Sequence, residues 1–153
     1  MTVKAINPLQ HLNQTIEENA ARSLAEARVR NRRVRVQKQR DTGRYHAVDS
    51  RVRNHENIHA SILGSAGGPV MYRYSRGPDG RMYAAGGSVK VDLSPVPGDH
   101  EATVRKARKI RLAAMGPQSP SGADIRVAAK AYRMEMAAKR ELRQEENPLS
   151  RYA

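Results

Sequence analysis

The residues available for a hydrophobic core set the strongest limit on what this chain can fold into. The chain has 153 residues, contains no Phe, Trp or Cys, and has six Tyr as its only aromatic residues. A core built mostly of Ala, Val, Ile, Leu, Met and Tyr is thin, so we expect a partner, a metal ion or an assembly to add stability. The absence of Cys also excludes disulfide bonds, thiolate metal sites, iron–sulfur clusters and Cys nucleophiles.

Length and hydropathy predict a protein of about one domain with no membrane span. The length fits one domain, or one domain with an additional arm. Hydrophobic residues make up 39% of the chain and the mean hydropathy is -0.75. No apolar run approaches the roughly 18–20 residues of a membrane span, and the N-terminus lacks the apolar segment of a secretory signal peptide. These features predict a cytoplasmic location, with unconventional export left open.

The net charge of +13 is concentrated in one part of the sequence. Residues 22–53 contain eleven Lys or Arg against three acidic residues. Such a segment favours an anionic partner, such as nucleic acid, acidic lipid headgroups or an acidic protein, although it also fits a solvated helix face or a mobile arm. No aromatic residue lies within residues 28–40, so base stacking is not indicated. The predicted contacts to an anionic partner are Arg28, Arg30, Arg32, Arg33, Arg35, Lys38 and Arg40.

Two helices are expected in the N-terminal part of the chain. Asn7 can cap a helix that starts at Pro8 and continues toward the basic segment, and residues 41–43 are expected to break it. A second helix is expected at about residues 47–63. Its apolar face is formed by Val48, Val52, His55, His59 and Ile62, which recur at steps of three and four residues.

The middle of the chain alternates in the way that β-strands do. Residues 77–80 read Gly-Pro-Asp-Gly and predict a tight turn. A second turn is expected at the glycine pair 86–87. The sequence therefore predicts a three-stranded antiparallel meander, with strands at about residues 70–74, 81–85 and 89–93.

Two further helices are expected near the C-terminus, one from Asp99 to Met115 and one that opens with a Ser-x-x-Asp pattern at Ser121. The predicted fold class is therefore α+β. We expect a basic helical arm at residues 1–40, a compact domain at residues 41–146 and a tail at residues 147–153.

The sequence His55-Glu56-Asn57-Ile58-His59 is an H-E-x-x-H pattern on the second predicted helix. Imidazoles four residues apart lie on one helix face, so both can bind a single Zn²⁺. The Glu that follows the first His can accept a proton from a metal-activated water. The alternative is structural: two half-buried His in a basic helix, with Glu56 paired to a neighbour.

A longer stretch, from about residue 39 to residue 143, resembles the SprA-related family of bacterial metalloproteases. The matching segments are DSRVRNHENIH at 49–59, YRYSRGPDGRMYA at 72–84, GGSV at 86–89, EATVRKA at 101–107, AAMGP at 113–117, PS at 120–121, Asp124 and VAA at 127–129. The resemblance implies a zincin-like domain, Zn²⁺ as the cofactor, His55 and His59 as ligands and Glu56 as the catalytic carboxylate.

The third metal ligand is the main departure from this family. The family pattern reads Gly-Gly-Glu-Val where this chain has Ser88, and a catalytic zinc site usually needs three protein ligands. We favour Glu101 as the substitute, although an acidic residue in the first turn of a helix is also favourable by itself. The other candidates are Asp92, Asp79 and His100.

The leading functional hypothesis is a zinc metallopeptidase that hydrolyses a peptide or protein substrate with Glu56 as general base. Tyr83 is a further candidate, as a donor to the developing oxyanion. The alternative is a catalytically weakened or inactive family member that acts as a binding component of an assembly through its basic arm. A protein that binds nucleic acid through the arm alone ranks third, because the sequence has no recognised nucleic-acid-binding motif.

Overall fold

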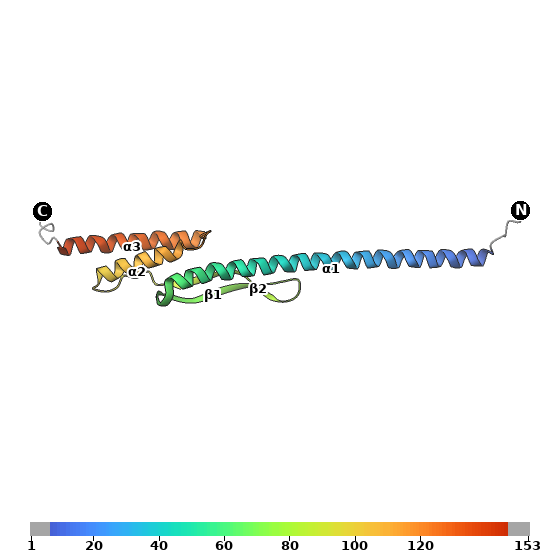
Figure 1. Ribbon diagram of the computed structural model, residues 1–153, viewed down its shortest axis with the longest axis horizontal. Coiled ribbons are helices and arrows are strands. Elements are labelled where there is room, and N and C mark those ends of the chain that lie inside the picture. The colour runs from blue at the N-terminus through green and yellow to red at the C-terminus, as the bar shows by residue number, and fades with distance from the viewer. Residues whose placement is uncertain (1–6, 147–153) are drawn as a thin grey trace. The chain divides into compact units, whose positions relative to one another are not determined.

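The computed structural model describes residues 7–146. Its elements, in chain order, are α1 (Pro8–Leu63), the short 3₁₀ helix η1 (Gly64–Ala66), β1 (Gly67–Arg76), β2 (Met82–Val91), α2 (His100–Ala114) and α3 (Gly122–Glu146) (Figure 1). The fold is therefore α+β, as predicted, with three helices and one two-stranded antiparallel sheet in the described part of the chain. The predicted tail at residues 147–153 lies outside the described residues.

The helix α1 begins where the sequence predicts but does not break. Asn7 caps its N-terminus, because the Asn7 Oδ1 accepts a hydrogen bond from the Leu9 amide at 3.1 Å. The expected break at residues 41–43 is wrong, since α1 continues to Leu63. Gly43 lowers helix stability by only about 1 kcal/mol relative to Ala. The Thr42 hydroxyl donates a hydrogen bond to the Lys38 carbonyl one turn earlier, so this polar group has a partner within the helix.

The predicted third strand is also wrong, because the glycine pair 86–87 lies inside β2 rather than at a turn. A Cβ on Gly86 would lie 2.7 Å from the Arg73 Nη2, and a Cβ on Gly87 would lie 2.6 Å from the Glu56 Cγ. These glycines are therefore needed for close approach of other side chains, not for chain reversal. The turn at residues 77–80 is confirmed: the Gly77 amide donates to the Arg81 carbonyl at 2.8 Å, and Gly80 has a φ of 87°.

The helices α2 and α3 begin at side-chain caps. Asp99 accepts a hydrogen bond from the Ala102 amide at 2.6 Å. At the start of α3, Ser121 and Asp124 bond to each other's backbone amides, which forms a capping box. The core contains several alanines, which let the helices approach closely, and consists of Leu63, Ala107, Ile110, Ala113, Ala131 and Met134.

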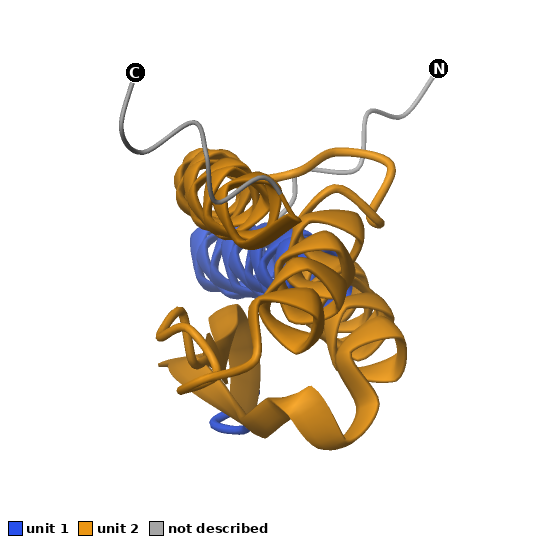
Figure 2. Ribbon diagram, turned by 90° about the vertical axis from the view of Figure 1, so that its left-hand side faces the viewer, with its two compact units in different colours: residues 1–45, 77–81 blue, residues 46–76, 82–153 orange. Residues whose placement is uncertain are grey.

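The chain divides into two compact units (Figure 2). One contains residues 1–45 with 77–81, and the other contains residues 46–76 with 82–153. The second unit holds the core and the C-terminal turns of α1, where the H-E-x-x-H pattern lies. No helix within residues 7–146 has a stretch apolar enough to cross a membrane.

Candidate metal centre

The last turns of α1 present the H-E-x-x-H side chains to the interior of the second unit. Glu56 and His59 are each 5% exposed, and His55 is half-buried. The His55 and His59 rings meet edge to face, with their centroids 4.7 Å apart. The two Nε2 atoms lie 3.1 Å apart, so both imidazoles point at one place, as the i, i+4 spacing predicts.

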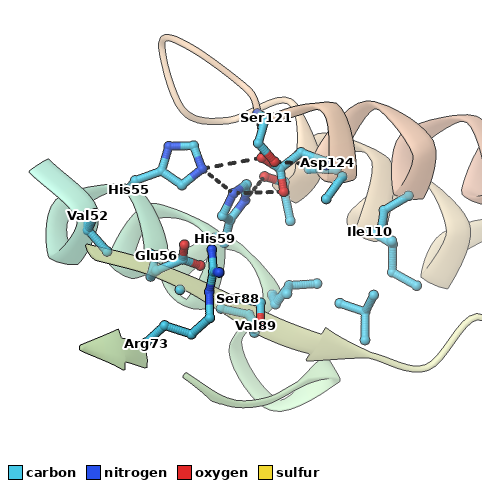
Figure 3. A pocket seen from close by; sticks show the side chains of 18 of the residues that line it. Val52, His55, Glu56, His59, Arg73, Ser88, Val89, Ile110, Ser121 and Asp124 are labelled. Atoms are coloured by element: carbon cyan, nitrogen blue, oxygen red, sulfur yellow. Dashed lines mark hydrogen bonds and ion pairs between the residues drawn. The ribbon is translucent and has the colours of Figure 1, made fainter. Parts of the chain in front are cut away.

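A carboxylate from α3 faces the same place (Figure 3). The Asp124 Oδ2 lies 3.3 Å from the His55 Nε2, and the Asp124 Oδ1 lies 3.3 Å from the His59 Nε2. These three side chains form a group whose ligand atoms could hold a metal ion. Asp124 is 65 residues beyond His59 in the sequence, so only the packing of α3 brings it there.

The size of this group suits a tetrahedral zinc ion. Two ligands that each lie 2.0–2.1 Å from zinc are about 3.3 Å from each other when the geometry is tetrahedral. Here the two Nε2 atoms lie 3.1 Å apart, and each lies 3.3 Å from a different oxygen of the Asp124 carboxylate. With one atom taken from each residue, the three donors lie within 4.8 Å of one another. Two imidazole nitrogens and one carboxylate also form a donor set that is typical of catalytic zinc sites with an open fourth position.

The hydrogen bonds of His59 determine which of its nitrogens faces the group. Its Nδ1 lies 2.8 Å from the Ala113 carbonyl oxygen, which can only accept, so Nδ1 carries the hydrogen. In neutral His59 the Nε2 lone pair then points at the Asp124 carboxylate. A proton or a metal ion must lie between two such electron-rich atoms. A metal-binding imidazole usually donates a hydrogen bond from its other ring nitrogen to a carboxylate or a backbone carbonyl, as His59 Nδ1 does here to the Ala113 carbonyl.

Asp124 is held in its ionised form by its own helix terminus. Burial acts to raise the pKa of the Asp124 carboxyl, but hydrogen bonds from Ser121 and the nearby His59 and His55 imidazoles outweigh that effect and place the pKa below its usual value. The Ser121 amide donates to the Asp124 Oδ2 at 2.6 Å. The carboxylate is therefore charged and oriented near neutral pH, as a metal ligand must be.

Glu56 lies beside this group and is not one of its three donors. Its side chain packs against Gly87 of β2, where any Cβ would collide with it. Burial raises the pKa of the Glu56 carboxyl, and the neighbouring imidazoles of His55 and His59 only partly oppose this. A carboxylate with a raised pKa is a better proton acceptor than an exposed one.

All four side chains line one pocket of about 460 Å³. Its walls come from α1, β2, α2 and α3, with one residue, Arg73, from β1. Gly86, Gly87 and Ser88 of β2 line the pocket, and Gly87 lies against Glu56. The cavity is large enough for a few residues of a peptide and is lined mostly by apolar atoms around a small polar group, as is typical of ligand sites.

The SprA-related family matches residues 5–148. This chain belongs to the SprA-related family. No curated protein and no solved structure matches the chain.

In this SprA-related chain, the side chains proposed as third ligand from sequence lie elsewhere. Glu101 is exposed and pairs with Arg105 at 3.3 Å. Asp92 pairs with Lys106 at 2.6 Å, which lowers the pKa of the Asp92 carboxyl to about 2. His100 lies 3.3 Å from Glu145.

Two other candidates also lie outside the donor group. Asp79 belongs to the turn between the strands, where it pairs with Arg81 at 3.8 Å. The Tyr83 hydroxyl lies 3.2 Å from the His46 Nε2, and Tyr83 is not among the residues that line the pocket. Ser88 does line it, but the third donor to the imidazoles is Asp124.

Sequence reasoning missed Asp124 as a candidate ligand even though the residue is one of those that carry the resemblance to the family. The Ser-x-x-Asp pattern has a sufficient local explanation as a capping box, and the capping box is indeed formed. One signal was available: an acidic residue in the first turn of a helix, within the matched segments, is a carboxylate of fixed orientation.

Proposed function

We propose that this SprA-related protein is a zinc metallopeptidase with a zincin-like site, in which His55, His59 and Asp124 bind the metal and Glu56 is the general base. The observation that carries the proposal is the convergence of two imidazole nitrogens, 3.1 Å apart, on the Asp124 carboxylate, a different oxygen of which lies 3.3 Å from each of them, with Glu56 buried beside them on α1. Zinc, when bound, would supply Lewis acidity to polarise a peptide carbonyl and to lower the pKa of a water molecule.

Other residues of the chain would move the proton and hold the side chains of the site in position. Glu56 accepts a proton at its carboxylate and can return it to the leaving amine, for which its raised pKa suits it. Gly87 fixes Glu56 in place, because the strand backbone fills the space behind the side chain. The Ala113 carbonyl holds the His59 ring with Nε2 toward the site.

The edge of β2 offers a way to hold a peptide. The sheet of the described chain has two strands, so β2 is paired with β1 along one edge only. Residues 86–89 of β2 line the pocket. An extended peptide that adds to a strand edge is held by its main chain, which favours protein substrates over small molecules.

The alternative of a catalytically weakened protein depends on the loss of a ligand at Ser88. Asp124 supplies a third donor that does not require residue 88, and this supports the active form of the proposal. The binding role of the basic arm is compatible with either form and is tested separately below.

The proposal is tested by hydrolysis of a mixed peptide library by the zinc-loaded protein, with wild type compared to Glu56→Gln. The substitution removes the proton acceptor and keeps the three ligands, so hydrolysis should fall by a factor of about 100 or more while zinc content stays at the wild-type level. Equal hydrolysis by the two proteins, or none by zinc-loaded wild type, would contradict the proposal.

A further inference from the structure

Arg73 reaches the pocket from the more distant strand of the sheet. Its Cα partner across the ladder is Gly86 of β2. The guanidinium lies over this glycine so closely that a Cβ there would be 2.7 Å from the Nη2 and 3.4 Å from the Cζ. Arg73 also lines the pocket, and Figure 3 shows its side chain directed past β2 toward the side where Glu56 lies. The glycine therefore makes room for this particular arginine.

An irregularity of the ladder occurs at the same position. Arg73 pairs with Gly86 and Tyr74 pairs with Ala84, so Ala85 is an additional residue on β2. A bulge of this kind changes the direction of nearby side chains and is often found beside active sites. Two independent features, the bulge and the missing Cβ, thus act on the direction of the Arg73 side chain.

Arg73 has no acidic partner in the part of the chain that the structure describes. Within residues 7–146, no carboxylate forms an ion pair with Arg73 or with Arg51, the other arginine that lines the pocket. Elsewhere in the same unit arginines do pair, as Arg53 does with Asp49 at 2.9 Å. An arginine aimed into a pocket presents a planar donor group that suits a carboxylate.

We infer that Arg73, with Arg51 nearby, forms a carboxylate-binding subsite, so that the preferred peptides carry a carboxylate close to the bond that lies at the metal centre. This inference rests on the proposed function, in which the pocket binds the peptide substrate, but carboxylate binding itself requires neither zinc nor hydrolysis. The carboxylate can belong to an acidic side chain or to a free C-terminus.

The test is equilibrium binding of fluorescein-labelled hexapeptides to the full chain, measured by anisotropy with and without zinc. One pair of peptides differs by Glu or Gln at a central position, and a second pair differs by a C-terminal acid or amide. Each peptide contains enough Lys to keep its net charge positive, which suppresses attraction to the basic arm. The Glu56→Gln background prevents turnover.

We expect a carboxylate peptide to bind about tenfold more tightly than its neutral match, as one charge-assisted bidentate contact allows. Arg73→Met should abolish this preference. Gly86→Ala should also abolish it while keeping the net charge, because the added Cβ displaces the guanidinium. Arg76→Met, which removes a positive charge from the same strand outside the pocket, should keep the preference. The pair that shows the preference identifies the source of the carboxylate.

Equal affinities within both pairs for wild type, or a preference that persists in Arg73→Met, would overturn the inference, as would the absence of measurable binding by every peptide. The measurement without zinc distinguishes two contacts. A preference for the carboxylate peptide that depends on Arg73 should persist in metal-free protein, whereas a preference caused by direct binding of the carboxylate to zinc should disappear. A protein that keeps the Arg73-dependent preference but does not hydrolyse any peptide would contradict the proposed function alone.

Discussion

Two adjacent glycines in β2 show how single residues shape the site. Gly86 and Gly87 lie within a strand, where glycine has no conformational advantage, and each faces a side chain of the candidate site so closely that an added Cβ would displace it. Gly87 lies against Glu56, and Gly86 lies against Arg73. Glycine in the interior of a strand weakens it, so the close approach gives a reason for both positions.

Gly87→Ala should therefore displace Glu56. The new Cβ would lie 2.6 Å from the Glu56 Cγ and 3.0 Å from its Oε1, so the carboxylate must move. Because a catalytic group displaced by about 1 Å can lose about 100-fold in rate, we expect a decrease of that order in kcat/KM for peptide hydrolysis, with zinc affinity retained. Steady-state kinetics beside a zinc titration would measure both.

Gly43→Ala is the matched control, because nothing lies within 4 Å of its Cβ position. It should keep wild-type kcat/KM. If Gly87→Ala also hydrolysed peptides at the wild-type rate, the assignment of Glu56 as a closely held base would be wrong.

At the scale of residues, the sequence predicts the half of the site that lies on one helix. The spacing of His55, Glu56 and His59 fixes their common position, because four residues are about one helical turn. Asp124 could not be derived in the same way, since its distance from the imidazoles depends on how α3 packs. Glu101 is the ligand favoured from sequence because it stands at the start of the next helix, as in the Glu-type zincins, but in the structure its carboxylate pairs with Arg105.

At the scale of elements, α2 and α3 are joined by a buried carboxylate. Glu135 of α3 is 2% exposed. It pairs with Arg108 at 2.9 Å and Arg111 at 3.3 Å, both from α2, and with Lys139 at 2.8 Å on its own helix. This contact holds α3, and with it Asp124, against the rest of the unit.

Glu135→Gln should destabilise the protein by about 1–3 kcal/mol, because three cations lose their shared carboxylate while remaining partly solvated. Urea unfolding measures this difference. Glu141→Gln, an exposed position on the same helix, serves as the control and should change stability by less than about 0.5 kcal/mol. Similar stabilities for wild type and Glu135→Gln would show that the network contributes nothing.

The same network predicts a dependence on pH. Lys139 and then Arg108 lower the pKa of the Glu135 carboxyl from its ordinary value of 4.5. Because this pKa is lower in the folded state than in the unfolded state, the ionised Glu135 carboxylate stabilises the fold. This contribution to the free energy of unfolding is fully present well above pH 4.5 and is lost as the pH falls through the pKa of the folded state. Urea midpoints of wild type should therefore decline below about pH 4.5 more steeply than those of Glu135→Gln. Parallel curves would contradict this.

The order of elements was largely predictable, and two errors share one cause. The sequence predicts a helix break at residues 41–43 and a turn at the pair 86–87, because glycine is common at both. In the structure α1 tolerates Gly43 through its continuing hydrogen bonds, and β2 uses its glycines for close contacts. Local sequence does not reveal the contacts of Gly86 and Gly87, because Arg73 and Glu56 are distant from them in the sequence.

At the scale of the whole molecule, the basic segment of α1 remains the strongest charge feature. Residues 28–40 are exposed and helical. Since successive residues of a helix are about 100° apart, the seven basic side chains point in all directions around the axis. This distribution favours a polyanion that is bound through its charge, without a single recognition face.

We expect the protein to bind double-stranded DNA and heparin with an affinity that falls steeply as salt concentration rises, because bound cations release counterions from the polymer. Replacement of Arg28, Arg30, Arg32 and Arg33 by Gln should decrease the slope of log affinity against log salt by about 3–4. The matched replacement by Lys should keep the slope. Binding that is independent of salt, or unchanged in the Gln variant, would exclude the segment as the contact.

The central claim is that three side chains from two distant helices bind one metal ion, and a zinc titration by calorimetry tests it most directly. The variants are Asp124→Asn, whose amide oxygen can still cap α3, and Glu101→Gln, which alters the ligand favoured from sequence. We expect one zinc ion per wild-type chain, an affinity at least about 100-fold lower for Asp124→Asn and an unchanged affinity for Glu101→Gln. Absence of zinc binding by wild type, or equal affinities for wild type and Asp124→Asn, would contradict the claim.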